Sequence, residues 1–180
     1  MRATQLLMEE HEIILRGLRV LEVLAAKAAR GDPVPPQAVD QMIGFLTGFA
    51  DTHHHHKEEE ILFPALEDAG LPSDGGPVGV MLQEHVQGRA LIAALRQAAP
   101  RVNGTGPERT EFATAARGYI TLLSGHIDKE NQVLFPMAAQ AIPHEDQQRL
   151  DEAFDEFERG AAANRTRFEG VVARLAKELL

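Results

Sequence analysis

The chain contains one pattern of histidine and glutamate twice, and this repeat constrains the fold more than any other feature. The first copy is EEH at His11 followed by HHHKEEEILFP from His54, and the second is QEH at His85 followed by HIDKENQVLFP from His126. In both copies nearly the same number of residues separates the lone histidine from the longer motif. Four of the 8 histidines therefore occupy one repeated frame, which indicates a metal site built by two related halves of the chain.

Each longer motif contains H-x-x-x-E, ending at Glu58 in the first copy and at Glu130 in the second. Residues i and i+4 project from the same face of an α-helix about one turn apart. Each histidine–glutamate pair can therefore reach one point in a helical core, and each lone histidine adds an imidazole from a neighbouring helix. The predicted ligands are His11, His54, Glu58, His85, His126 and Glu130.

This donor set fits a pair of divalent ions. Two glutamates remove two of the four positive charges, a bridging hydroxide can remove one more, and a carboxylate can bridge two ions through its two oxygens. Nitrogen and oxygen donors without thiolate suit iron or manganese, and by affinity alone also zinc or copper. The alternative is a purely structural bundle with fortuitous histidines, but six such groups buried together without a metal would be costly.

The rest of the chain reads as helices separated by clusters of glycine and proline. Leu7, His11, Ile14, Leu18 and Leu21 recur at spacings of three and four along the first helix. Short loops between long helices imply antiparallel neighbours. We therefore predict an all-α fold, an up-down-up-down antiparallel four-helix bundle with an additional C-terminal helix. The predicted helices cover about residues 4–30, 37–68, 78–99, 108–140 and 145–177.

Two details of this organisation are open to test. Pro64 and Pro136 each lie six residues after a predicted ligand glutamate, and each is predicted to kink or end its helix.

We divide the chain into a metal-binding bundle at 1–142 and a C-terminal helix at 143–180. The apolar face of that last helix suits packing on the bundle or a dimer contact, so the chain is expected to be a monomer or a homodimer.

Composition excludes several classes. The absence of cysteine removes disulfides, thiolate zinc sites and iron–sulfur clusters held by the chain's own thiolates. A net charge of -9 without a basic block argues against nucleic-acid binding. No apolar run approaches the roughly 20 residues of a membrane span, and no signal-peptide core is present, so a cytoplasmic location is expected.

The repeated motifs resemble a known family. HHHHKEEEILFPALE and GHIDKENQVLFPMA are similar to the second- and fourth-helix motifs of the hemerythrin-like family, described as cation-binding domains with a repeated His–His–Glu pattern, and GPVGVMLQEH is similar to its third-helix entry. The resemblance covers about residues 4–140. It implies an up-down four-helix bundle with a non-haem centre of two iron ions, bridged by oxo or hydroxo and by carboxylates. It also implies the same six ligands.

The chain departs from the oxygen-carrier branch at Arg89, where that branch has a fifth histidine one turn after the third-helix ligand. His55 is the best substitute for this missing ligand. Arg89 itself either pairs with a ligand glutamate or is a surface arginine in a salt bridge. Tyr119 lies two turns before His126 on the same helix face. It is predicted to donate a proton or a hydrogen bond to a metal-bound molecule or to ligate the metal; a plain core aromatic is the alternative. Glu59 is predicted to be solvated or paired with a lysine. Predicted apolar walls are Leu7, Met81, Leu122 and Leu123.

The functional prediction is a non-haem di-iron protein that binds O2, NO or H2O2 for sensing, detoxification or redox turnover. The four-histidine, two-glutamate set resembles the bacterial branches linked with iron–sulfur repair under nitrosative stress. The alternative is a non-enzymatic module that binds or stores iron or oxygen. Whether the chain is an enzyme stays open, and its electron donor is unknown.

Overall fold

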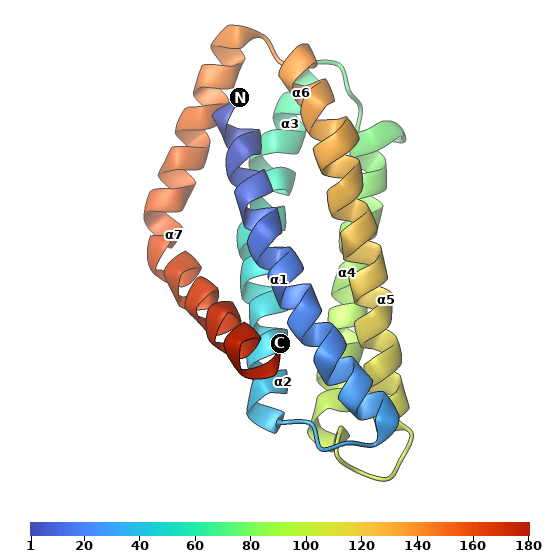
Figure 1. Ribbon diagram of the computed structural model, residues 1–180. Coiled ribbons are helices and arrows are strands. Elements are labelled where there is room, and N and C mark those ends of the chain that lie inside the picture. The colour runs from blue at the N-terminus through green and yellow to red at the C-terminus, as the bar shows by residue number, and fades with distance from the viewer.

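The computed structural model describes residues 1–180, and all of its regular elements are helices. They join into five continuous rods, of which four lie side by side in Figure 1 while the fifth crosses them. The all-α prediction is confirmed. The rods are α1 (Arg2–Arg30); α2 (Pro36–Phe45), η1 (Leu46–His55), η2 (Glu58–Leu62) and α3 (Phe63–Asp68); α4 (Gly76–Ala98) with η3 (Ala99–Arg101); α5 (Glu108–Lys129), η4 (Glu130–Leu134) and α6 (Phe135–Ala141); and α7 (His144–Leu179).

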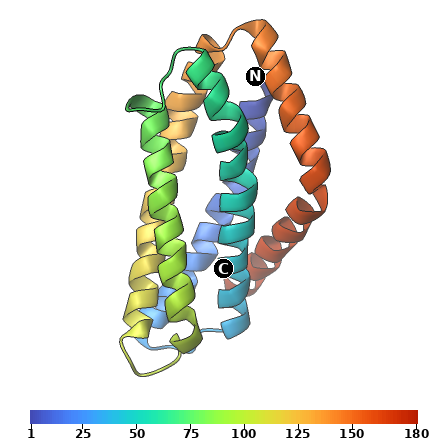
Figure 2. The same ribbon diagram turned by 180° about the vertical axis from the view of Figure 1, so that it is seen from behind.

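The glycine and proline clusters separate the rods as the sequence predicts. Gly31 follows α1 with φ 79°, in the left-handed conformation that glycine adopts without a steric penalty. Its N–H donates to the carbonyl of Ala28, and that of Asp32 donates to the carbonyl of Lys27, which closes the end of the helix. Pro36 begins α2, where a missing N–H costs nothing. In Figures 1 and 2 the chain reverses direction at each link between rods.

The prolines of the two long motifs do not end their helices, contrary to one reading of the sequence. Pro64 and Pro136 lie in the first turns of α3 and α6, and each rod continues beyond them. The segments just before them, η2 and η4, are π-helical. Where the hydrogen bonding of a rod changes from i→i+5 back to i→i+4, one backbone N–H is left without a carbonyl partner. Proline suits this position because it has no N–H to leave unpaired.

The core consists of two apolar clusters with a polar layer between them. The larger cluster occupies the end of the bundle where α1 finishes, and the smaller one the end where α1 begins. Of the predicted apolar walls, Leu7 and Met81 belong to the smaller cluster and Leu123 to the larger, whereas Leu122 is only half-buried. The smaller cluster comprises Ala3, Leu7, Leu62, Phe63, Leu66, Val78, Met81, Leu134, Phe135, Ala138, Ile142, Leu150 and Phe154.

The last helix lies on the bundle across α1 and the rod from α2 to α3 (Figure 1). Leu150 and Phe154 of α7 join the smaller apolar cluster, and Phe168, Val172 and Leu175 join the larger one. The stretch of α7 between these two anchors passes the polar layer. None of the helices combines the length and the apolar character that crossing a membrane requires.

Candidate metal centre

The polar layer between the two apolar clusters contains all six predicted ligands. Each of the first four rods contributes, and each of the six residues is at most 1% exposed to solvent. In α1, for example, Leu7 belongs to the smaller cluster, His11 to the polar layer and Ile14 to the larger cluster. Residues three and four apart on one helix face thus lie in successive layers of the bundle, with the ligand in the middle layer. The residues are His11, His54, Glu58, His85, His126 and Glu130.

Local π-helical turns position the ligands on the second and fourth rods. The segment η1 ends at His55, η2 begins at Glu58, and η4 begins at Glu130. A π turn inserts an extra residue into the helix and rotates the side chains around it, and such turns are frequent at functional sites. The helical spacing of the sequence predicts regular α-helix here and does not indicate these π-helical segments.

The potential donor atoms fall into two groups that share a glutamate. One group is His11, His54, Glu58 and Glu130, and in it the donor atoms all lie within 4.8 Å of one another. In this group Nε2 of His11 lies 3.0 Å from Nε2 of His54. The two repeat copies thus both contribute to this group. The second group, on the same criterion, is His55, Glu58, His85 and His126.

Each glutamate lies between a histidine of one group and a histidine of the other. Oε1 of Glu58 is 3.3 Å from Nε2 of His54, and Oε2 is 3.4 Å from Nε2 of His85. Glu130 does the same, with Oε2 3.2 Å from Nε2 of His11 and Oε1 3.3 Å from Nε2 of His126. This is the arrangement that two bridging carboxylates need.

The four oxygens of Glu58 and Glu130 are buried without a hydrogen-bond partner of good geometry. A buried carboxylate that lacks partners is strongly disfavoured unless a cation compensates its charge. The pKa of Glu130 nevertheless lies well below its usual value: burial raises it, but the close approach and positive charge of His126 and His11 outweigh burial. The residues present therefore fit a centre of divalent cations.

The outer nitrogen of each histidine donates to an acceptor in a pattern that also repeats. Nδ1 of His54 donates to Glu10 (2.8 Å) and Nδ1 of His126 to Glu84 (3.0 Å), and both carboxylates directly precede a lone histidine in the sequence. Because a carboxylate can only accept, the proton of each neutral ring lies on Nδ1 and the Nε2 lone pair faces inward. That is the tautomer that a metal ligand needs.

The two lone histidines follow the same rule with partners from the other motif. Nδ1 of His85 donates to Glu59 (2.6 Å), and Nδ1 of His11 donates to Oδ1 of Asn131 (2.9 Å). Glu59 and Asn131 occupy equivalent places in the repeat, directly after a predicted ligand glutamate. Burial lowers the pKa of His85, but the nearby carboxylate of Glu58 and the hydrogen bond to Glu59 raise it to about 9.

These four acceptors are not among the residues predicted from the sequence, although the repeat contained the signal. Each is the immediate neighbour of a predicted ligand in its own copy, so reading the aligned copies one residue further would have found them. The prediction that Glu59 is solvated or paired with a lysine was wrong. Glu59 accepts a hydrogen bond from His85 and forms an ion pair with Arg89. Nη2 of Arg89 lies 2.7 Å from Oε1 of Glu59. Arg89 also holds Asp51 at 2.8 Å and does not pair with a ligand glutamate.

The remaining histidines of the HHHH run separate into three environments. His56 is exposed, as a helix surface residue would be. His53 is buried, 3.1 Å from Glu10 and 3.0 Å from Glu158. His55 is buried in the second donor group. Burial and the neighbouring charges of His85 and His126 hold the pKa of His55 well below its usual value, so its ring is neutral.

Tyr119 lies in the larger apolar cluster, 1% exposed, and its hydroxyl has no hydrogen-bond partner. Its ring packs beside Gly88 of α4. Burial, and then the charge of Asp51, raise its pKa above the usual value. The Tyr119 hydroxyl therefore makes no hydrogen bond to any of the predicted ligands.

A third cluster of possible donors, Glu10, His53 and Glu158, already contains a cation. The Lys57 ammonium lies 2.5 Å from Oε1 of Glu10 and 2.5 Å from Oε1 of Glu158, and its side chain is fully buried. Burial raises the pKa of Glu10, but hydrogen bonds from His53 and His54 and the charges of His54 and Lys57 lower it well below its usual value. This cluster is an ion-pair network, which supports His54 and reaches α7.

Comparison with known proteins agrees with this geometry. The hemerythrin HHE cation binding domain model matches residues 2–138. The uncharacterized protein Rv1995 of Mycobacterium tuberculosis is 26% identical over 173 residues, which cover 94% of this chain and 66% of that protein. The iron-sulfur cluster repair protein YtfE of Escherichia coli K12 is 30% identical over 130 residues, 71% of this chain and 56% of YtfE.

The chain thus spans 66% or less of the length of these relatives. No solved structure gives a significant match. The family model nevertheless covers both copies of the repeat, with every histidine and glutamate of the two donor groups. The chain therefore belongs to the hemerythrin HHE cation binding domain family.

Proposed function

We propose that this chain binds two iron ions, one at each donor group, and that the pair binds a small molecule such as O2, NO or H2O2. Glu58 and Glu130 would bridge the two ions, together with an oxo or hydroxo group, and the six predicted ligands would supply the protein donors. The observation that carries this proposal is the pair of buried carboxylates, unpartnered and each placed between histidines of the two groups. The first four rods would form the family's up-down-up-down bundle at 1–142, with 143–180 as an addition.

When bound, two iron ions can supply the two electrons that reduction of such a molecule needs. The protein's own part is to orient and to exclude water. The acceptors on Nδ1 hold each ring with Nε2 inward, and the apolar clusters on either side of the layer keep bulk water away. The likeness to YtfE, an iron-sulfur cluster repair protein, supports a role that involves iron. We propose that this role is in nitrosative or oxidative stress, in which the centre senses, detoxifies or turns over its ligand.

Metal analysis tests the proposal. Iron-loaded protein is expected to hold two irons per chain, and Glu58→Ala and Glu130→Ala are expected to lose at least one of them. Glu60→Ala is the matched control, since Glu60 is exposed two residues from Glu58. A wild-type stoichiometry near zero, or unchanged iron in both variants, would refute the proposed site.

The response to oxygen tests what the centre does. Iron(II)-loaded protein prepared without oxygen is exposed to air and then purged, while its visible spectrum is recorded. A band that appears with oxygen and vanishes on purging identifies reversible binding, as in a carrier or sensor. Irreversible conversion to an oxo-bridged ferric spectrum identifies redox turnover, with peroxide and nitric oxide as the next substrates.

A non-enzymatic sensing or storage module is the second candidate, favoured by the contact between the polar layer and α7. Glu158 and Arg165 of α7 lie 2.5 Å from Lys57 and 3.4 Å from Glu10, respectively, and Glu10 accepts from His54. Sensing predicts that amide hydrogen exchange in α7 differs between the reduced and oxidised iron-loaded protein. Equal exchange in the two states would count against a signal through α7.

A further inference from the structure

We infer that His55 is a seventh protein donor to the proposed centre and serves the group that contains Glu58, His85 and His126. This inference rests on the proposed two-iron function and names a residue outside the six predicted ligands. A ring nitrogen of His55 lies within 4.8 Å of the donor atoms of all three residues, and the side chain is buried. The sequence pattern left its role open.

The environment of His55 leaves its ring without any other partner. Both ring nitrogens are buried and neither makes a hydrogen bond. Every other buried histidine of the polar layer has at least one hydrogen-bond acceptor. A buried polar group without partners costs free energy that a metal–nitrogen bond would offset. A solvated surface histidine does not fit these contacts.

The His55 ring faces a carboxylate with its Nδ1 but does not bond to it. Its Nδ1 lies 3.6 Å from Oδ1 of Asp51, beyond hydrogen-bond distance, and Arg89 holds the same oxygen at 2.8 Å. With Nδ1 toward Asp51, Nε2 is the nitrogen left for the metal. The rings of His55 and His85 stack, with centroids 3.9 Å apart and planes 18° apart, so that both rings approach the group side by side.

His55 also breaks the symmetry of the repeat. The alignment that pairs His54 with His126 pairs His55 with Ile127, which is buried in the larger apolar cluster. The group containing His11 and His54 therefore receives no third imidazole. Arg89 occupies the third-helix place that the oxygen-carrier branch fills with histidine, and here it holds the carboxylates of Asp51 and Glu59. The additional imidazole comes from the second rod instead.

Mössbauer spectroscopy of protein loaded with 57Fe, together with chelator competition, tests the inference. Wild type is expected to show two unlike quadrupole doublets of equal area. His55→Ile, which installs the residue that the second repeat copy uses, is expected to change one doublet and to weaken binding of one iron at least tenfold. His56→Ala is the control, since His56 is exposed beside it. His55→Gly with added imidazole should restore the wild-type doublet.

If these variants fail to fold, the number of metal-bound histidines can be counted in the wild-type chain instead. In zinc-loaded protein labelled with 15N at histidine, five of the 8 rings are expected to show metal-shifted nitrogen resonances. The inference would be overturned if only four rings showed shifted resonances. It would also be overturned if folded His55→Ile kept the wild-type doublets and iron affinity. Either result would leave the two-metal centre intact. Failure of wild type to bind two metals would instead overturn the proposed function.

Discussion

The ligand histidines and their outer acceptors behave as units that the repeat carries together. Glu10 and Glu84 each precede a lone histidine and accept from the histidine of a long motif, while Glu59 and Asn131 each follow a ligand glutamate and accept from a lone histidine. A lysine completes each copy, because Lys57 contacts Glu10 and Lys129 contacts Glu84. The carboxylates that orient the imidazoles are thus themselves neutralised by cations, which lowers the cost of burying them.

Tyr119 is the residue whose predicted role the structure supports least. We expect Tyr119→Phe to raise the free energy of unfolding of the metal-free protein by about 1 kcal/mol, because it removes a buried hydroxyl that has no partner. Because burial and Asp51 raise the pKa of Tyr119, its phenolate is disfavoured as a ligand. The visible spectrum of the iron-loaded variant should therefore match wild type. A strong charge-transfer band present in wild type and lost in the variant would show that Tyr119 does ligate.

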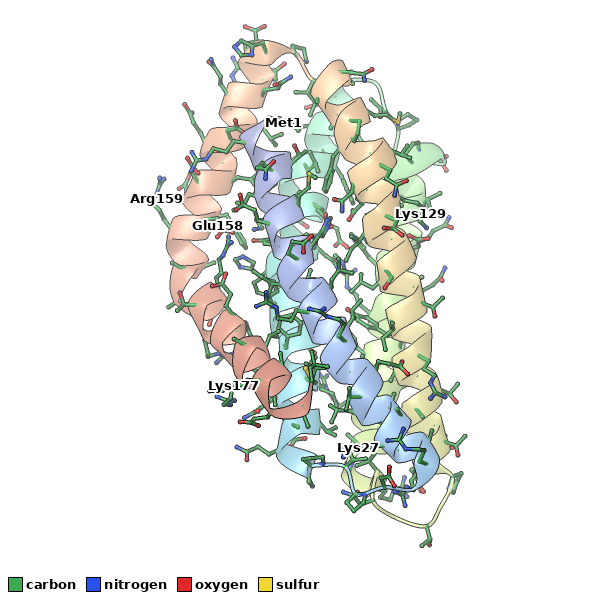
Figure 3. All side chains as sticks on the ribbon, viewed as in Figure 1. Met1, Lys27, Lys129, Glu158, Arg159 and Lys177 are labelled. Atoms are coloured by element: carbon green, nitrogen blue, oxygen red, sulfur yellow. The ribbon has the colours of Figure 1, made fainter.

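At the level of elements, the last helix follows the same three layers as the bundle. Its two apolar ends pack on the two apolar clusters, and Glu158 between them meets Lys57 of the second rod. Figure 3 shows Glu158 and Arg159 on this middle stretch of α7. The sequence pattern predicted an apolar face on α7 but not its ion pairs, because these depend on which rod the helix crosses.

The ion pair of Glu158 predicts a dependence of stability on pH. Burial raises the pKa of Glu158, but hydrogen bonds from His53 and Lys57 and the charge of Lys57 lower it to about 2, against an opposing effect of Glu10. Arg165 also faces it, at 3.1 Å. A depressed carboxyl pKa contributes stability that is present above the unfolded value of 4.5 and is lost as pH falls toward 2.

We therefore expect the melting temperature of wild type to fall between pH 4.5 and about 2 more steeply than that of Glu158→Gln. At neutral pH Glu158→Gln should be less stable than wild type, because the fully buried Lys57 ammonium loses one of its two carboxylate partners. Glu156→Gln, an exposed change on the same helix, is the control and should follow wild type. Parallel curves for Glu158→Gln and wild type would contradict this account of α7.

At the scale of the whole molecule, a polar layer divides the apolar core in two. Figure 2 shows α4 beside the rod from α2 to α3, and these two rods carry His55, Glu58 and His85 of the second donor group, whose fourth member, His126, lies on α5. The layer holds the buried carboxylates without hydrogen-bond partners, so metal-free protein carries a cost that bound metal offsets. Metal binding and folding stability should accordingly be coupled.

Metal removal tests this coupling. A site filled at free metal 100-fold above its Kd contributes about 2.7 kcal/mol to stability. We expect a strong chelator to lower the melting temperature of the iron-loaded protein markedly, as measured by differential scanning calorimetry. The double variant Glu58→Ala/Glu130→Ala should show no effect of chelator, because it has no centre to lose. An equal effect on both proteins would mean that the chelator acts elsewhere.

The sequence by itself determined the helical rods, their separators and the level at which the ligands lie. These features depend on the 3.6-residue period, on glycine and proline, and on a repeat, all of which can be read along one chain. Only the tertiary structure decided the π-helical turns before Pro64 and Pro136, the acceptors on each Nδ1 and the place of His55. Those depend on how neighbouring rods are rotated against one another, and a rotation of one residue, about 100°, moves a side chain from the core to the surface.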